Sequence, residues 1–129
     1  MNKIIVEVSI GELLDKVSIL EIKQEKIKDS EKLKFINNEH SVLKEQLKKS
    51  VKSDEKLDML YQSLKEINSK LWLIEDEKRL CEKEKDFGEK FIKLSRDVHF
   101  LNDDRAKIKL KINNHTGSKI KEIKEYTKY

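Results

Sequence analysis

The side chains most able to do chemistry lie in two stretches, residues 68–79 and 101–113, where amides, acids, arginines and the only tryptophan border stripes of apolar residues. A polar group beside a helical seam must be paired, hydrated or functional, because stranding a buried donor or acceptor costs about 1–3 kcal/mol. We therefore expect any activity to lie in these stretches. With two residues that lie just before the second stretch, they predict a polar cluster of Asn68, Trp72, Glu75, Asp76, Arg79, Arg96, His99, Asn102, Asp103, Arg105, Lys109 and Asn113.

Three interpretations of this cluster differ in what the polar groups meet. The first is structural, with buried ion pairs and amides that fix the register of a helical bundle. The second is recognition, in which Trp72 and neighbouring Arg and Asn side chains bind a partner, since tryptophan and arginine dominate binding hot spots. The third is catalysis on a nucleotide or nucleotide-sugar, with Arg96 and Arg105 binding phosphate and Glu75 as the base. The sequence favours the first.

The acids in and beside these stretches also raise the question of a metal site. Mg²⁺ prefers oxygen ligands, and five carboxylates could supply them: Glu75, Asp76, Glu82, Asp103 and Asp104. Arginines stand among these acids and compete with a cation, so ion pairing is the favoured outcome. Cys81 is the single cysteine and the three histidines are dispersed, so no zinc spacing occurs. With no glycine-rich phosphate loop either, we expect neither a metal nor a cofactor.

Three helices are predicted to position these residues. Residues 9–12 (SIGE) form a capping box, and an apolar face follows that predicts one long helix over about 10–49. Asp29 and Ser30 could instead cap a fresh helix, which leaves a break there possible. The second helix, over about 54–84, has the most regular heptad stripe. The third spans about 87–114 and ends before Gly117, since glycine readily takes the left-handed conformation after a helix.

Short connections make neighbouring helices antiparallel. The sequence therefore predicts an all-α fold, an elongated, coiled-coil-like antiparallel three-helix bundle forming a single domain over residues 1–129. Residues 3–8 predict a short extended arm, and residues 117–129 a basic tail. An antiparallel count from the second turn brings the polar cluster to one level of the bundle, with Arg96 near Glu75 and Arg105 near Glu66.

The composition supports long helices and indicates which partners and which compartment to expect. Of the 129 residues, 42% are charged and none is proline. The net charge of +4 is uneven, because residues 105–129 hold eight Lys or Arg against two Glu. A basic end can bind nucleic acid, but a solvated lysine-rich tail is the favoured explanation. No apolar run reaches membrane-spanning length, no signal peptide is recognisable, and a lone cysteine suits a reducing compartment, so we expect a cytoplasmic protein.

Several segments resemble those of a family of small, uncharacterised bacterial helical proteins. The main ones are residues 6–16 (VEVSIGELLDK), 71–76 (LWLIED) and 102–106 (NDDRA), with shorter matches at 19–23, 91–94, 108–109 and 112–113. The resemblance implies no catalytic residue. It implies an accessory role beside the glycosyltransferases of surface-glycan biosynthesis. Asp97 and His99 stand where serine and tyrosine are more usual in that family, and Ile10 replaces a common proline.

Apolar residues off the main seams complete the expectation. Large exposed apolar patches are unusual on monomers, and five residues predict a second buried face: Ile19, Ile22, Leu73, Leu80 and Phe100. We therefore expect a non-catalytic interaction or accessory protein that binds a protein partner or a second copy of itself. A small phosphorylated ligand and nucleic acid are the alternatives.

Overall fold

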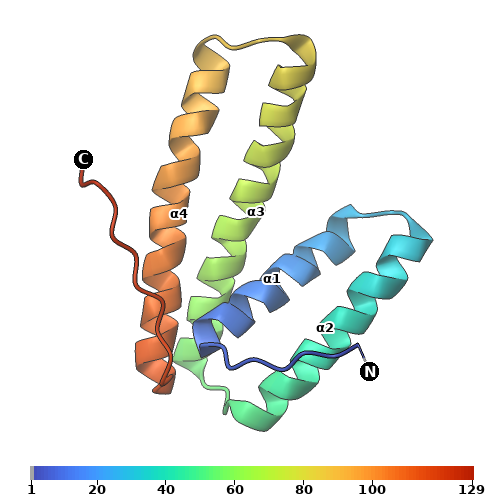
Figure 1. Cartoon of the computed structure of the whole chain (residues 1–129), viewed down its shortest axis with the longest axis vertical. Coiled ribbons are helices and arrows are strands. Elements are labelled where there is room, and N and C mark those ends of the chain that lie inside the picture. Colours follow the sequence, from blue (N-terminus) through green and yellow to red (C-terminus); the bar gives the residue numbers. More distant parts are fainter. Residues whose placement is uncertain (1) are drawn as a thin grey trace.

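Four α-helices account for most of the chain in the computed structural model, which describes residues 2–129 (Figure 1). They are α1 (Ile10–Lys26), α2 (Ser30–Ser50), α3 (Glu55–Glu84) and α4 (Glu89–Thr116). The described residues contain no strand, so the predicted all-α class is confirmed. No helix among them combines the length and apolar composition that a membrane-spanning segment needs.

The predicted long helix over 10–49 is wrong, because the chain reverses between Lys26 and Ser30. Ile27 leaves helical geometry with φ −88° and ψ 131°, and the Asp29 carboxylate accepts hydrogen bonds from the backbone N–H groups of Glu31 and Lys32 at 2.9 and 3.2 Å. This cap starts a new helix, as the alternative break at Asp29 anticipated. The fold therefore has four helices rather than three, and α2 runs back along α1 (Figure 1).

The other helix ends follow local chemistry. Ser9 Oγ accepts from the Glu12 N–H at 3.1 Å, and Asp54 accepts from the Leu57 N–H at 2.7 Å, so each caps the helix that follows. Lys85 takes the left-handed conformation with φ 54° and ends α3. The third predicted helix begins two residues later than expected, at Glu89, because Asp86 bonds the Gly88 N–H in a tight turn instead of capping the helix. Gly117, with φ 69°, ends α4.

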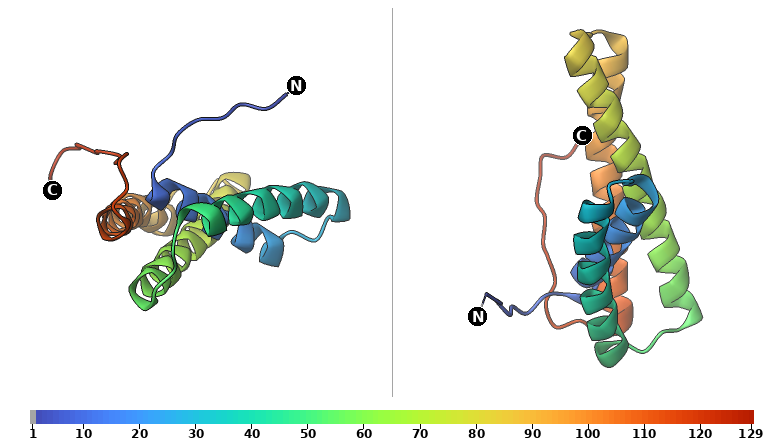
Figure 2. Two further views of the ribbon diagram at one scale, coloured as in Figure 1. Left: turned by 90° about the horizontal axis from the view of Figure 1, so that it is seen from below. Right: turned by 90° about the vertical axis from the view of Figure 1, so that its right-hand side faces the viewer.

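Helix α1 is the element that joins the others. Within residues 2–129, α1 packs against α2, α3 and α4. Helix α2, by contrast, packs against no helix other than α1. Helices α3 and α4 form an antiparallel hairpin whose far half projects beyond α1 and α2 (Figures 1 and 2). The core cluster of Leu14, Leu57, Leu64 and Ile112 lies where α1 meets this hairpin. The predicted elongated three-helix bundle is therefore not what forms.

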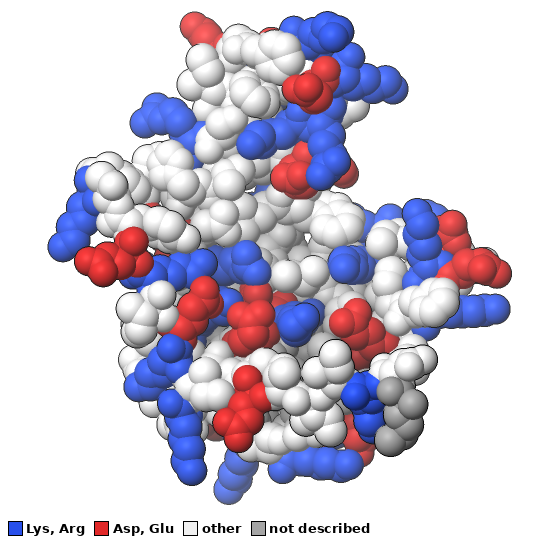
Figure 3. All heavy atoms as spheres, viewed as in Figure 1, with Lys and Arg blue, Asp and Glu red and all other residues white. Residues whose placement is uncertain are grey.

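The two ends of the chain leave this junction together. The Ile10 N–H donates to Ser118 Oγ at 3.2 Å, so the arm before α1 and the tail after α4 share a root. The tail has no regular secondary structure and returns along α4, where Tyr129 packs edge-on against the rings of His99 and Phe100. On the face seen in Figure 3, basic and acidic side chains are interspersed, and no field of one sign covers it.

A close approach of α1 and α4 lies at Gly11 and generates a stability prediction. A Cβ atom on Gly11 would lie 2.7 Å from the Lys109 carbonyl oxygen and 2.9 Å from Asn113 Oδ1. We expect Gly11→Ala to lower the free energy of unfolding by up to about 2 kcal/mol, because overpacking costs about 1–3 kcal/mol and the gain in helix propensity is about 1 kcal/mol. Chemical denaturation measures the change.

Gly88→Ala is the matched control for this substitution. A Cβ atom there meets only Asp86 Oδ1 at 3.4 Å, an ordinary contact, so the variant should lose only about 0.5 kcal/mol through its poorer helix cap. An increase in stability on Gly11→Ala would mean that α1 and α4 do not approach this closely.

Candidate functional site

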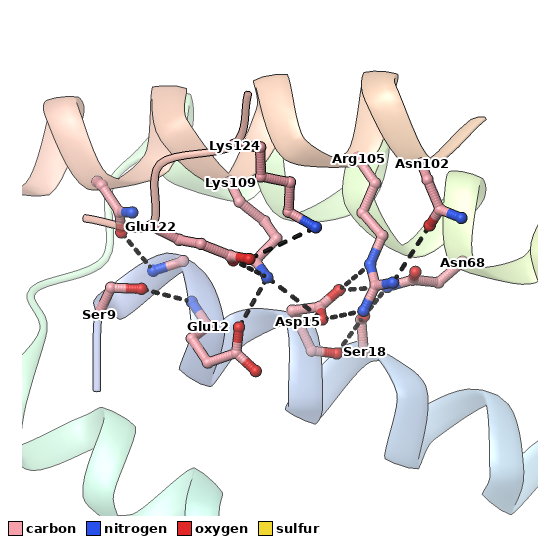
Figure 4. A network of polar contacts seen from close by, with 12 residues as sticks. Ser9, Glu12, Asp15, Ser18, Asn68, Asn102, Arg105, Lys109, Glu122 and Lys124 are labelled. Carbon is pink, nitrogen blue, oxygen red and sulfur yellow. Dashed lines mark hydrogen bonds and ion pairs between the residues drawn. The ribbon is translucent and has the colours of Figure 1, made fainter. Parts of the chain in front are cut away.

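The polar cluster centres on Asp15 of α1, which is only 1% exposed (Figure 4). Its carboxylate accepts from Arg105 Nε at 3.0 Å and from Arg105 Nη2, so the guanidinium binds it through two nitrogens. Asn68 Nδ2 on α3 donates to the same carboxylate at 2.9 Å, and Lys109 Nζ lies 3.8 Å away. Three helices therefore converge on one buried charge.

A second set of contacts surrounds this carboxylate. Asn68 Nδ2 also donates to Ser18 Oγ at 2.8 Å, and the Ser18 hydroxyl donates to the Asp15 carbonyl at 2.8 Å. Asn102 Oδ1 lies 3.5 Å from Arg105 Nη1, at the limit of a hydrogen bond. Each polar atom that faces Asp15 therefore has a partner within the protein.

Lys109 extends the network from the buried centre to the surface. Its ammonium donates to Glu12 at 2.7 Å and to Glu122 of the tail at 3.3 Å, and Glu122 also pairs with Lys124 at 3.4 Å (Figure 4). This ladder of alternating charges holds the first turn of α1 and the tail against the same face of α4.

The start of α1 is held by hydrogen bonds from distant residues. The first N–H groups of a helix have no partner within it. Here the Gly11 N–H donates to Asn113 Oδ1 at 2.7 Å, the Ile10 N–H donates to Ser118 Oγ, and Ser9 caps the Glu12 N–H. Asn113 can reach Gly11 because no side chain stands between the two helices.

Electrostatics keep these groups ionised. Burial by itself raises the pKa of Asp15, but the hydrogen bonds from Arg105 and Asn68 and the positive charges of Arg105 and Lys109 outweigh it and hold the pKa below its ordinary value. The hydrogen bond to Asp15 raises the pKa of Arg105. Burial lowers the pKa of Lys109, yet the Glu12 hydrogen bond and the nearby acids raise it overall. The charges of the cluster are therefore engaged with one another.

The polar side chains of this arrangement are paired with one another. No buried side-chain nitrogen or oxygen in residues 2–129 lacks a hydrogen-bond partner. The same residues contain no group of three or more His, Cys, Asp or Glu side chains placed to hold a metal ion. A cavity of about 200 Å³ between α1, α2 and α3 is lined mostly by apolar side chains, and none of the predicted cluster residues lines it. The arrangement suits a network that fixes helix positions.

Five of the twelve predicted residues meet at this site. They are Asn68, Asn102, Arg105, Lys109 and Asn113, and all face α1. The other seven lie outside the network. Trp72 is half-buried on α3, Asp76 is exposed, and Glu75 and Arg79 pair on the surface of α3 at 2.9 Å.

Three of the remaining predicted residues lie on α4, in the region that the tail reaches. Arg96 stands 6.0 Å from the centre of the Phe100 ring, His99 packs against Phe100 and Tyr129, and Asp103 accepts a hydrogen bond from the Tyr129 hydroxyl. Arg96, His99 and Asp103 therefore have their partners on α4 and in the tail, outside the Asp15 network.

The contacts of the two arginines are to groups other than those that the antiparallel count placed near them. Arg105 pairs with Asp15 rather than Glu66, and Arg96 lies beside an aromatic ring rather than Glu75. The antiparallel count followed only the second and third predicted helices, whereas the reversal after Lys26 lets α1 cross both of them. Sequence reasoning missed Asp15 and Ser18, although an acid and a hydroxyl within the apolar face of Leu14 and Val17 are the signal that could have found them.

A second polar cluster, which was not predicted from the sequence, connects α2 with α1 and α3. Glu21 on α1 accepts from the Tyr61 hydroxyl of α3 and pairs with His40 Nε2 of α2 at 2.9 Å. Lys65 and Glu25 pair beside it at 2.9 Å. Burial and the hydrogen bond to Glu21 raise the pKa of Tyr61, so its hydroxyl stays protonated and donates. This cluster again uses α1 as the common element.

Removing the guanidinium tests the central ion pair. We expect Arg105→Met to lower the free energy of unfolding by about 3 kcal/mol, the low end of the range for breaking a buried pair, because it leaves the Asp15 carboxylate buried with fewer partners. Arg79→Met, which breaks an exposed pair with Glu75, should change stability by no more than about 0.5 kcal/mol. Equal losses in chemical denaturation would mean that Asp15 is solvated.

The lowered pKa of Asp15 predicts a pH dependence. Because this pKa is lower in the folded than in the unfolded chain, the carboxylate stabilises the fold above about pH 4 and loses that effect as the pH falls through the folded pKa. We expect Asp15→Asn to be less stable than wild type at neutral pH and the two free energies of unfolding to converge in acid. Parallel pH profiles of Asp15→Asn and wild type would mean that Asp15 is exposed.

Comparison with known proteins identifies a family. No curated protein matches the chain, and no solved structure matches it. A family model described as a family of unknown function (DUF6165) matches residues 4–129, which include α1 to α4, the arm from Ile4 onward and the tail. The match therefore contains every residue of the Asp15 network, and the chain belongs to this family of unknown function.

Proposed function

We propose that the protein is a non-catalytic interaction protein that binds another protein through the projecting half of the α3–α4 hairpin. The observation that carries this proposal is the exposure of large apolar side chains there. Five of them are between 39% and 55% exposed: Leu73, Leu80, Phe87, Ile92 and Phe100. Full burial of a large apolar side chain contributes about 1.5–3 kcal/mol, and these side chains retain roughly half of their exposed area, so each adds roughly half of that value when a partner covers it.

Three of these side chains mark one side of the hairpin, which we call the hairpin face. A shallow groove there is lined by Leu73, Ile74, Phe100 and Leu101, with Lys70 and Asp97 as its charged members. Leu80 lies seven residues beyond Leu73, two turns along the same side of α3. An apolar groove with a few polar groups at its edge is typical of a protein-binding surface.

The chemistry of the Asp15 network supports a binding role over a catalytic one. A phosphate-binding arginine needs a free guanidinium, but Arg105 is engaged by Asp15. Arg96, the other arginine of the nucleotide hypothesis, lies beside Phe100, apart from that network. The nucleic-acid alternative depends on the basic end of the chain, where Lys109 is paired with Glu12 and Glu122. Neither alternative has an assembled site in its favour.

The proposal also specifies the class of protein that binds. The family resemblance implies that such proteins accompany glycosyltransferases of surface-glycan biosynthesis, so the proposed partner is an enzyme of that class in the cytoplasm. An accessory protein needs a surface that a partner can cover and a body stable enough to present it. The hairpin face and the Asp15 network fit these two requirements.

Charges placed on the hairpin face test the binding role. We expect Leu73→Glu combined with Phe100→Glu to abolish capture of the partner from extracts of the native cells, because both charges would be buried in the complex, while the melting temperature stays within a few degrees of wild type. Phe35→Glu combined with Val42→Glu, at exposed positions of α2, is the matched control. Loss of the same captured protein in both double variants would contradict the assignment of the surface.

A thermal-shift screen tests the enzyme alternative. A ligand present at 100 times its Kd adds about 2.7 kcal/mol of stability, which is readily measured. We expect no shift with nucleotides, nucleotide-sugars or divalent metal ions. A shift with a nucleotide-sugar that disappears in Arg96→Gln would place a phosphate site on α4 and overturn the non-catalytic proposal.

A further inference from the structure

The segment before α1 is an apolar arm with nothing beside it. Residues 2–8 run in an extended path away from the helices, and Figure 2 shows the arm standing clear of them. Its β-branched side chains are open to solvent, with Ile4 89%, Ile5 85%, Val6 69% and Val8 44% exposed. None of the hydrogen bonds found in residues 2–129 involves this arm, so its backbone donors and acceptors are all free.

The root of this arm is fixed. Ser9 is 5% exposed and caps α1, and the next residue, Ile10, donates its N–H to Ser118. The arm therefore leaves the protein from a rigid point, and its direction is set by the same contacts that hold α1 against α4. A rigid root lowers the conformational entropy that binding must offset.

The arm has the pattern of a β-strand that lacks a neighbour. Side chains alternate between the two faces of a strand, so Ile4, Val6 and Val8 share one face and Lys3, Ile5 and Glu7 the other. Isoleucine and valine are favoured in strands. A strand with a row of unpaired N–H and C=O groups is a template for pairing with another chain.

The side chains of the arm are complementary to those of the same arm in a second copy of the protein. We propose that the arms of two copies pair as antiparallel strands about Ile5, which makes the protein a two-fold symmetric dimer. In this register Lys3 lies opposite Glu7 of the other copy and Ile4 lies opposite Val6, each twice, while Ile5 meets its own copy. Opposite charges and apolar residues directly across an antiparallel pair stabilise it, and a two-fold interface is the commonest kind among homo-oligomers.

Other registers lose this complementarity. A shift of one residue places Glu7 opposite Ile4 or opposite Asn2, and parallel pairing places Lys3 beside Lys3. Like charges side by side are destabilising. Two strands alone are only marginally stable, so the helices of the two copies must cover one face of the ribbon. The face of Ile4, Val6 and Val8 is the apolar one and is the face to be covered.

This dimer goes beyond the proposed function and does not depend on it. The arm leaves at the start of α1, whereas the hairpin face lies on the half of the hairpin that projects away from α1 (Figure 1). Pairing through the arms therefore leaves both hairpin faces available to a partner.

Cysteine cross-linking under mild oxidation tests the register. Residues directly opposite in an antiparallel pair lie about 4.5–5.5 Å apart between Cα atoms, within the range that a disulfide spans. In a Cys81→Ala background, which removes the native cysteine, we expect Ile5→Cys to form a covalent dimer rapidly. Val8→Cys is the control on the same arm, because in this register it lies about 20 Å from its copy along the ribbon.

Two single variants map the register further. A mixture of Ile4→Cys and Val6→Cys chains should cross-link to each other faster than either does to itself, because these positions face each other. Equal rates at Ile5→Cys and Val8→Cys would show that the arms collide at random and would overturn the proposal.

The oligomeric state gives a second, independent measurement. We expect wild type to sediment as a dimer that dissociates on dilution. Ile5→Asp should be monomeric, because it sets two carboxylates face to face. Lys3→Glu should weaken the dimer, and adding Glu7→Lys should restore it. A monomeric wild type would overturn the proposal. A dimer that Ile5→Asp leaves intact and that Leu73→Glu with Phe100→Glu dissociates would also overturn it, and would assign self-association to the hairpin face instead.

Discussion

The carboxylate of Asp15 imposes the constraint on which this fold depends. A carboxylate that is almost completely buried is unfavourable by several kcal/mol unless cations and donors surround it. Here they come from two other helices, Asn68 from α3 and Arg105 and Lys109 from α4. The charge therefore fixes the height at which α1 crosses the α3–α4 hairpin. Since α2 packs only against α1 in the part of the chain described, the position of α2 follows from the same crossing.

The close crossing determines what else the chain must provide. Helix α1 comes near enough to α4 that only glycine fits at position 11, and that approach brings Asn113 and Ser118 to the free N–H groups of the first turn. Apolar packing alone would allow α1 to slide along the hairpin, because Leu, Ile and Val contacts carry no direction. Hydrogen bonds to Asp15, Gly11 and Ile10 remove that freedom. Desolvating these polar groups costs free energy. In return they define one position for α1, which is the best-attested use of polar groups in helical seams.

Local features could be predicted from the sequence and long-range ones could not. The second and third helices were predicted to within two residues at each end, because heptad stripes, the Asp54 cap and Gly117 are local signals. The first failed because the apolar face predicted to continue over residues 10–49 outweighed the cap at Asp29. That error also hid the site. When α1 and α2 are treated as one continuous helix, the sequence gives no reason to place Asp15 opposite Arg105. Five residues of the cluster were therefore predicted without the carboxylate that they surround.

The distribution of polar and apolar groups also bears on what the protein does. Every buried polar side-chain atom in residues 2–129 has a hydrogen-bond partner within the protein. The surface is different, because leucine, isoleucine and phenylalanine side chains stand exposed on the hairpin and an unpaired β-branched arm extends from α1. Both features are unfavourable in water and promote association. The Asp15 network is therefore the fixed frame of the fold, and the exposed apolar residues of the arm and hairpin are the surfaces on which the proposed contacts depend.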